Sequence, residues 1–159
     1  MLSRTGASGP PVPARGRNVT YTKDMLDAAP TGVPLATEDV AAAIDACLSC
    51  LQACVSCADA DLVEQDVDEL STCIALCLNC AEVCDVTARF LSRPAHRELF
   101  TVHRLLQACV RSCADSAAEC AKHAHHHQHC AICEKVCREC VRASDTLLDD
   151  ESFEELQRS

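Results

Sequence analysis

Residues 47–57 read CLSCLQACVSC, a stretch in which four cysteines follow one another at steps of three, four and three residues. Steps of three and four place side chains on the same face of an α-helix, one turn above the other. The stretch contains no Gly and no Pro, which favours an unbroken helix. It therefore predicts a helix with a stripe of thiols along one side.

The same stripe recurs three more times along the chain. Residues 130–140 repeat the steps of three, four and three, whereas residues 73–84 use four, three and four. Residues 109–120 follow the latter pattern, with Ser116 in its third place. All fifteen cysteines lie on these stripes: Cys47, Cys50, Cys54, Cys57, Cys73, Cys77, Cys80, Cys84, Cys109, Cys113, Cys120, Cys130, Cys133, Cys137 and Cys140. Because Ala, Val or Leu would fill such positions without a risk of oxidation, the set favours metal ligation over simple packing.

Four long helices are expected, because four segments are almost free of internal Gly and Pro. They run from residue 37 to about 62, from about 65 to 91, from 95 to about 123, and from about 127 to 148. Thr37 is expected to cap the first helix, and Pro94 to stand at the start of the third. Short connections imply antiparallel neighbours. The predicted fold is all-α: an antiparallel up-down-up-down four-helix bundle with a Cys-lined core, over residues 37–148.

The flanking segments have a different composition. Residues 1–36 are predicted to be an N-terminal extension, disordered over its Gly-, Pro- and Arg-rich part at 1–19. A short helix is expected at residues 21–29, on the outside of the bundle. Residues 149–159, DDESFEELQRS, are predicted to be a frayed acidic tail.

Composition excludes several classes of function. No apolar segment near the N-terminus has the length of a secretory signal, and no membrane span is expected, so the predicted location is cytoplasmic. Thiols stay reduced there, and an odd number of cysteines cannot pair completely within one chain. A net charge of −10 and only 3% aromatic residues argue against a nucleic-acid partner. No nucleophile and base are arranged together, so an enzyme is not predicted.

Antiparallel helices would stack the stripes into four layers, with one place per helix. The predicted layers are Cys47, Cys84, Cys109 and Cys140; Cys50, Cys80, Cys113 and Cys137; Cys54, Cys77, Ser116 and Cys133; and Cys57, Cys73, Cys120 and Cys130. Zinc sites with four thiolates each bury a double negative charge, and several stacked together are costly. Cu(I) takes two or three thiolates, so about one ion per cysteine would neutralise the core. The lattice predicts binding and storage of multiple Cu(I) ions; the alternative is a protein with iron–sulfur or zinc sites in redox chemistry or metal detoxification.

The cysteine lattice, together with ECAKHAHHHQHCAIC at residues 119–133, resembles the cytosolic copper storage proteins. The resemblance covers residues 37–148. It implies a four-helix bundle that holds many Cu(I) ions on core cysteines, and a homo-oligomer, a tetramer. Ser116 and the N-terminal extension depart from the family pattern.

The two ends of the thiol column are expected to differ. At one end the stripes continue into Asp61 and His123. His127 and His129 stand just before Cys130, at the same end. These four side chains are predicted to be exposed metal ligands at a mouth where copper enters, and a solvated loop is the alternative for the histidines. An apolar plug is predicted at the other end, formed by Val40, Ile44, Leu91, Val102, Leu105, Leu106 and Leu147.

Overall fold

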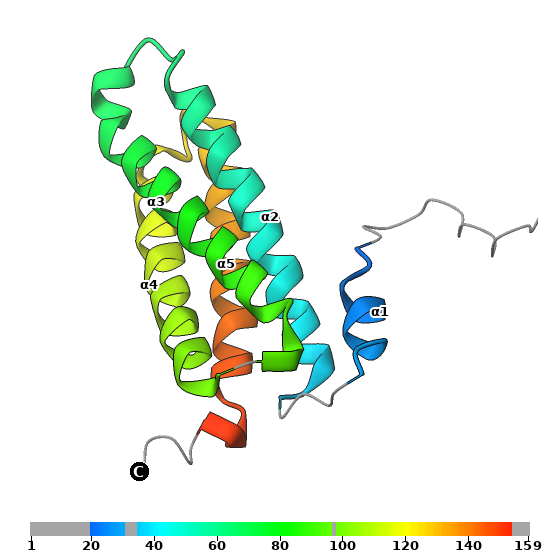
Figure 1. Ribbon diagram of the computed structural model, residues 1–159. Helices are drawn as coiled ribbons and strands as arrows, with labels where there is room; N and C mark the ends of the chain where they lie inside the picture. The colour runs from blue at the N-terminus through cyan, green and yellow to red at the C-terminus, as the bar shows by residue number, and fades with distance from the viewer. Residues whose placement is uncertain (1–19, 31–34, 97, 154–159) are drawn as a thin grey trace, which may run out of the picture.

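The computed structural model describes residues 20–30, 35–96 and 98–153. Its main body is a bundle of long helices packed side by side (Figure 1). The elements in chain order are α1 (Thr22–Asp27), α2 (Thr37–Asp61), α3 (Val67–Leu91), the short 3₁₀ helix η1 (Pro94–His96), α4 (Leu99–His123) and α5 (Gln128–Leu148). α2 packs against α3 and α5, and α4 packs against the same two helices. The four long helices therefore form a square in cross-section around one core.

Neighbouring long helices run in opposite directions, as short connections require. Residues 62–66 join α2 to α3, and residues 124–127 join α4 to α5, both at the upper end in Figure 1. The connection between α3 and α4, which contains η1, lies at the opposite end. The predicted all-α up-down-up-down bundle is confirmed.

The predicted start of the third bundle helix is wrong by four residues. Pro94 begins η1, whereas α4 begins at Leu99. The reason is a cap that the prediction did not include. The carboxylate of Glu98 accepts hydrogen bonds from the backbone N–H of Phe100 (2.9 Å) and of Thr101 (2.7 Å). These bonds satisfy two of the N–H groups that the first turn of a helix leaves free.

The ends of α2 and α3 also differ slightly from the prediction. The cap position of α2 is Ala36, and Thr37 is already the first helical residue, without a side-chain cap. α2 ends at Asp61 and α3 begins at Val67 rather than near residue 65. The intervening turn is therefore longer than expected, which matters because it carries acidic side chains to the end of the thiol column.

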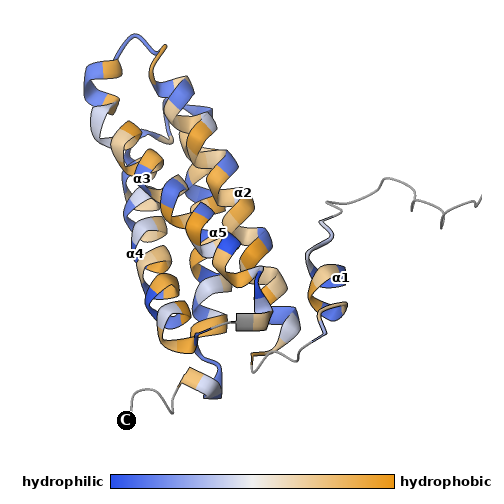
Figure 2. Cartoon of the chain, in the orientation of Figure 1, coloured by the Kyte–Doolittle hydropathy of each residue, from blue (hydrophilic) through white to orange (hydrophobic). Residues whose placement is uncertain are grey.

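The long helices bury one face and expose the other. Figure 2 shows apolar and polar residues interleaved along all four of them. By length and composition alone, α2 and α3 resemble membrane-crossing helices, contrary to the expectation that no segment would. Most of the buried residues of both helices are Cys and Ala, which face the bundle interior. The core helices of water-soluble proteins have the same property, so the similarity is weak evidence for a membrane span.

The lower end of the bundle in Figure 1 is closed by apolar side chains. Six of the seven predicted plug residues are buried: Val40, Ile44, Leu91, Val102, Leu106 and Leu147. Leu105 is only half-buried, so its assignment to the plug is wrong. It precedes Leu106 by one residue, which turns its side chain by about 100° around the helix axis.

Part of the predicted acidic tail also packs on this end. Phe153 is only 1% exposed, and its ring lies 5.3 Å from that of His103. The backbone N–H of Ala36 donates to Asp150 Oδ2 at 3.3 Å. A frayed tail is therefore the wrong description of residues 149–153, because a buried aromatic ring holds them. Residues 154–159, like residues 1–19 with their predicted disorder, lie outside the described part.

α1 lies along the outside of α2 (Figure 1). Its Leu26 is buried, and the Thr22 hydroxyl donates to Asp45 Oδ1 at 2.5 Å. Lys23 Nζ lies 3.2 Å from Glu38 Oε1. The helix is shorter than the predicted 21–29, and one apolar anchor with two polar contacts holds it against the bundle.

Candidate metal centre

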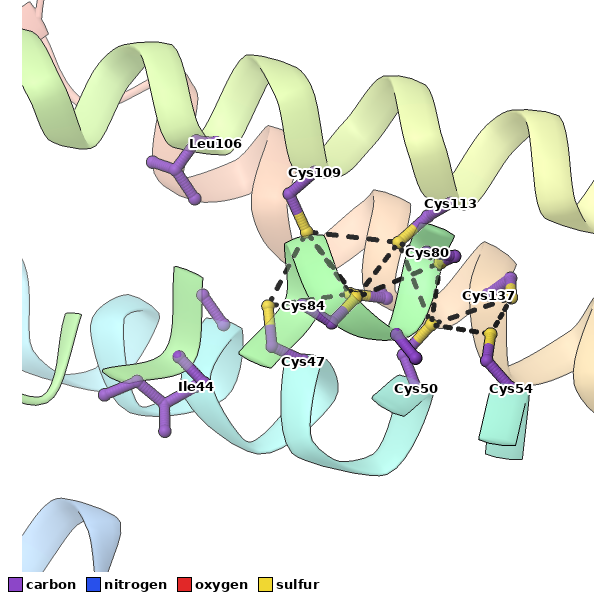
Figure 3. Packing of buried hydrophobic residues seen from close by; sticks show 14 of the residues in the cluster. Ile44, Cys47, Cys50, Cys54, Cys80, Cys84, Leu106, Cys109, Cys113 and Cys137 are labelled. Carbon is purple, nitrogen blue, oxygen red and sulfur yellow. Dashed lines mark hydrogen bonds between the residues drawn. The ribbon is translucent and has the colours of Figure 1, made fainter. Parts of the chain in front are cut away.

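The cysteine lattice forms a column of thiols along the bundle axis. All fifteen cysteines fall within the described residues, all are free thiols, and none is more than 1% exposed. Figure 3 shows the part of the column nearest the plug, where Cys47, Cys84 and Cys109 project from different helices toward one another, with Ile44 and Leu106 beyond them. The column is thus dry, reduced and closed by apolar groups at that end.

The layer next to the plug has one thiol from each long helix. Cys109 Sγ lies 3.7 Å from Cys47, 3.9 Å from Cys84 and 4.0 Å from Cys140. The Cys140 and Cys47 sulfurs are 3.8 Å apart. All four sulfurs lie within 4.8 Å of one another, so a small soft cation between them reaches several ligands without backbone movement.

The second layer has the same composition. Cys50 Sγ lies 3.7 Å from Cys80, 3.8 Å from Cys113 and 3.6 Å from Cys137. The Cys80 and Cys113 sulfurs are 3.5 Å apart. Cys50 therefore contacts one thiol from each of the other three long helices (Figure 3).

The third layer contains Ser116 where the others have a fourth thiol. The Ser116 hydroxyl is fully buried and lies 3.5 Å from Cys77 Sγ, 3.7 Å from Cys137 Sγ and 3.9 Å from Cys54 Sγ. The Cys54 and Cys133 sulfurs are 3.7 Å apart. A hydroxyl thus occupies a lattice place, and it offers a hard oxygen where the neighbouring places offer soft sulfur.

The fourth layer adjoins the end with the short loops. Cys73 and Cys120 have sulfurs 3.6 Å apart, and Cys57 and Cys130 have sulfurs 3.9 Å apart. The layers assembled from helix direction and spacing are therefore brought together in space, in the predicted order.

Contacts between layers are as short as those within them. The sulfurs of Cys54 and Cys137 are 3.5 Å apart, and those of Cys84 and Cys113 are 3.6 Å apart. The column is thus continuous rather than a set of separate four-ligand sites. A continuous column suits an ion that shares bridging thiolates, and it does not suit isolated tetrahedral zinc sites.

Burial favours the neutral form of the thiols in the absence of metal, because it penalises the charge of a thiolate. Burial, reinforced by the charge of Asp61, raises the pKa of the Cys130 thiol to about 12. Hydrogen bonds with Cys113 and Cys137, together with burial, raise the pKa of Cys50. Neutral thiols pack as small apolar groups, so metal binding must release protons from the core.

A mixed cluster lies where the column meets the loops. The ligand atoms of Cys57, Asp61, His129 and Cys130 all lie within 4.8 Å of one another. The Cys130 thiol donates to Asp61 Oδ1 at 3.5 Å, and His129 Nδ1 lies 3.5 Å from the same oxygen. The structure therefore brings two of the four predicted mouth residues together with two thiols.

Asp61 is fully buried, so the expectation of an exposed carboxylate at the mouth is wrong. Asp61 follows Cys57 by four residues, which places it on the interior face of α2. Burial raises the pKa of its carboxyl group. Its Oδ2 has no hydrogen-bond partner among the described residues. A buried carboxylate oxygen without a partner costs free energy unless a cation or proton satisfies it, so this oxygen fits a metal ligand.

The other two predicted histidines contact carboxylates instead of thiols in the described structure. His127 Nε2 lies 3.1 Å from Asp66 Oδ2, and a hydrogen bond to that carboxylate raises the pKa of His127. His123 Nε2 lies 3.6 Å from Glu119 Oε1. Both histidines lie at the mouth end of the bundle, His123 at the end of α4 and His127 just before α5, near the mixed cluster.

Sequence reasoning missed Glu64. Glu64 Oε1 lies 3.2 Å from His129 Nε2 and 3.3 Å from His127 Nδ1. The residue belongs to the turn between α2 and α3, where no helical period predicts the direction of a side chain. The available signal was its closeness in sequence to Asp61, three residues earlier.

A helical bundle with a continuous column of reduced thiols and an acid–imidazole cluster at one end is a binder of many soft metal ions. The chain belongs to the copper storage protein family, whose family model matches residues 36–149. Membership favours copper over the iron–sulfur and zinc alternatives.

Two solved structures from Streptomyces lividans are similar to this chain. One is the copper storage protein Ccsp loaded with 10 copper equivalents, with 41% identity and a TM-score of 0.79, covering 80% of this chain and 97% of that one. The other is a cytosolic copper storage protein with five coppers, with 43% identity and a TM-score of 0.70, covering 71% of this chain and 94% of that one. A further relative is the uncharacterized cysteine-rich protein YhjQ of Bacillus subtilis (strain 168), 33% identical over 102 residues, which are 63% of this chain and 87% of that protein.

Proposed function

We propose that this protein stores copper as Cu(I) in the cytosol, on the thiolates of its fifteen core cysteines. The continuous sulfur column carries this proposal. Neighbouring sulfurs lie 3.5–4.0 Å apart in its inner layers, and at the mouth Cys57 lies within 4.8 Å of Cys73, Cys77 and Cys120. Each monovalent ion that replaces a proton leaves the core charge unchanged. A loading of about one ion per cysteine is therefore compatible with a dry interior.

The oxidation state follows from the ligands. Thiolates are soft and select Cu(I), whereas Cu(II) prefers nitrogen and oxygen ligands in tetragonal arrangements. The cytosol supplies the reducing conditions that keep so many adjacent thiols from forming disulfides. The copper-loaded relatives from Streptomyces lividans, one of them cytosolic, support copper as the metal and the cytosol as the location.

Copper enters the column at the mixed cluster. Asp61 and His129 supply oxygen and nitrogen ligands next to Cys57 and Cys130, so an arriving ion meets mixed ligands before the all-sulfur layers. The opposite end is closed by the apolar plug. His123 and His127 assist from the rim of the mouth. The role is storage, with no catalytic step.

Self-association is supported by exposed apolar side chains. Leu48, Val55 and Ile132 are 41%, 47% and 52% exposed, respectively. A groove of about 750 Å³ is lined by residues of α2 and α5, Leu48 and Ile132 among them. We propose that this face joins copies of the chain into a homo-oligomer, a tetramer as in the family resemblance. Sedimentation of the apo protein would give the mass directly.

An anaerobic titration tests the storage function. Fully reduced protein is titrated with Cu(I) in the presence of a chromogenic Cu(I) chelator, and bound metal is counted after desalting. We expect more than about ten ions per chain, because each thiolate takes roughly one monovalent ion. Saturation at about three or four ions, or displacement of copper by equimolar Zn(II), would instead indicate tetrahedral zinc-type sites.

A further inference from the structure

His129 places its two ring nitrogens in different surroundings. Nδ1 lies 3.5 Å from Cys130 Sγ, 3.6 Å from Cys57 Sγ and 3.5 Å from Asp61 Oδ1. Nε2 lies 3.2 Å from Glu64 Oε1. One nitrogen thus faces the mixed cluster, and the other faces a carboxylate on the turn between α2 and α3.

This arrangement selects the form of the ring that binds metal. Nε2 and Glu64 Oε1 are hydrogen-bonded at 3.2 Å, whereas Nδ1 lies 3.5 Å from Asp61 Oδ1, which already accepts from the Cys130 thiol. A carboxylate can only accept a hydrogen bond, so the nitrogen bonded to Glu64 carries the proton. A neutral imidazole with hydrogen on Nε2 has its lone pair on Nδ1, which is the atom that faces Cys57 and Cys130. We propose that Glu64 is a positioning residue, which holds His129 in the tautomer and orientation that present Nδ1 to incoming Cu(I).

Glu64 is itself held in place, although it lies in a turn and is partly exposed. The same Oε1 lies 3.3 Å from His127 Nδ1, and the other nitrogen of His127 lies 3.1 Å from Asp66 Oδ2. The rings of His127 and His129 have centroids 5.3 Å apart. Carboxylates from the turn between α2 and α3 therefore alternate with imidazoles at the start of α5. The alternation ties the two loops of the mouth together and orients Glu64.

The inference rests on the proposed function, because it concerns the delivery of copper to that same column. Carboxylate partners of metal-bound histidines typically contribute a factor of about 10–100 to metal affinity. We therefore expect Glu64→Ala to weaken binding of the first Cu(I) ion, and to slow uptake, by roughly tenfold. Final capacity stays unchanged, because the core thiols remain.

The experiment compares three variants of the full chain. Glu64→Ala removes the acceptor, and Glu64→Gln keeps an amide oxygen that still accepts from Nε2–H. Glu69→Ala is the matched control, since it removes the same charge from the first turn of α3. The Glu69 side chain forms no hydrogen bond or ion pair within the described part of the chain. Each variant is made with His129 present and with His129→Ala.

Two measurements are made on each variant. The first is the ¹⁵N chemical shift of the histidine rings in the metal-free protein, at a pH where they are neutral, which reports the tautomer. The second is the stopped-flow rate of Cu(I) transfer from a chelator, together with the affinity for the first equivalent. Circular dichroism verifies that helix content is unchanged.

We expect hydrogen on Nε2 of His129 in the wild type and in Glu64→Gln, and a mixture of tautomers in Glu64→Ala. The loss in copper uptake should appear only where His129 is present, and Glu69→Ala should behave as wild type. Hydrogen on Nδ1 in the wild type, or an equal Glu64→Ala effect with and without His129, would overturn the inference. Since the tautomer is measured without metal, its failure is distinct from a failure of the wild type to take up Cu(I), which would refute storage itself.

Discussion

Replacing Ser116 with cysteine would complete the lattice at its one missing place. The Ser116 hydroxyl oxygen lies 3.5–3.9 Å from the sulfurs of Cys77, Cys137 and Cys54. These distances equal the separations between neighbouring sulfurs elsewhere in the column. A sulfur at residue 116 would therefore have three soft partners within contact distance.

The expected effect of Ser116→Cys on capacity is one additional Cu(I) per chain, at about one ion per thiolate. The effect on the unfolding free energy of the apo protein should be within about 1 kcal/mol. The hydroxyl makes only weak contacts with sulfur, and the two side chains are close in volume. Binding should thus change while folding does not.

Native mass spectrometry under anaerobic Cu(I) saturation resolves a difference of one ion. Ser116→Ala is the control, because it removes the hydroxyl without adding a ligand and should keep the wild-type capacity. If correctly folded Ser116→Cys binds no more copper than Ser116→Ala, then the third layer is not part of the storage column, and the layer model of loading is refuted.

Three further predictions concern the stability of the apo protein and the end of the bundle at which copper enters. The apo protein should remain fully helical by circular dichroism, because neutral thiols fill the core without metal; a random-coil spectrum would contradict this. In the folded state the pKa of the Cys130 thiol is raised to about 12, above the value of about 8.5 expected in the unfolded chain. The contribution of this thiol to stability is therefore fully present below about pH 8.5 and is lost as the pH rises toward 12, so the unfolding free energy of the apo protein should fall over that range. Denaturant titrations at pH 7 and pH 10 would measure the loss, and equal midpoints would count against it. Changing Asp61, His123 and His129 together to Ala should slow Cu(I) loading in stopped-flow experiments but preserve capacity, whereas Leu91→Ala at the plug should affect stability more than uptake. If only the plug variant alters uptake, copper enters from the other end.

The sequence by itself was sufficient to predict the bundle and the composition of its four thiol layers. The relevant information is local, since steps of three and four fix which side chains share a helix face. Short connections then fix the alternating direction of the helices, and direction fixes which residues share a layer. The same reasoning placed Asp61 and Ser116 on the cysteine stripes and identified six of the seven plug residues.

Only the tertiary structure decided what happens at the ends of the helices. Glu98 displaced the start of α4, Phe153 turned a predicted tail into part of the closed end, and burial replaced the expected exposure of Asp61. Glu64, in the turn between α2 and α3, contacts His129 at the start of α5, although the two are far apart in the sequence. A turn has no regular repeat from which the direction of its side chains can be predicted. The contacts of turn residues therefore depend on how the packed helices bring the loops together.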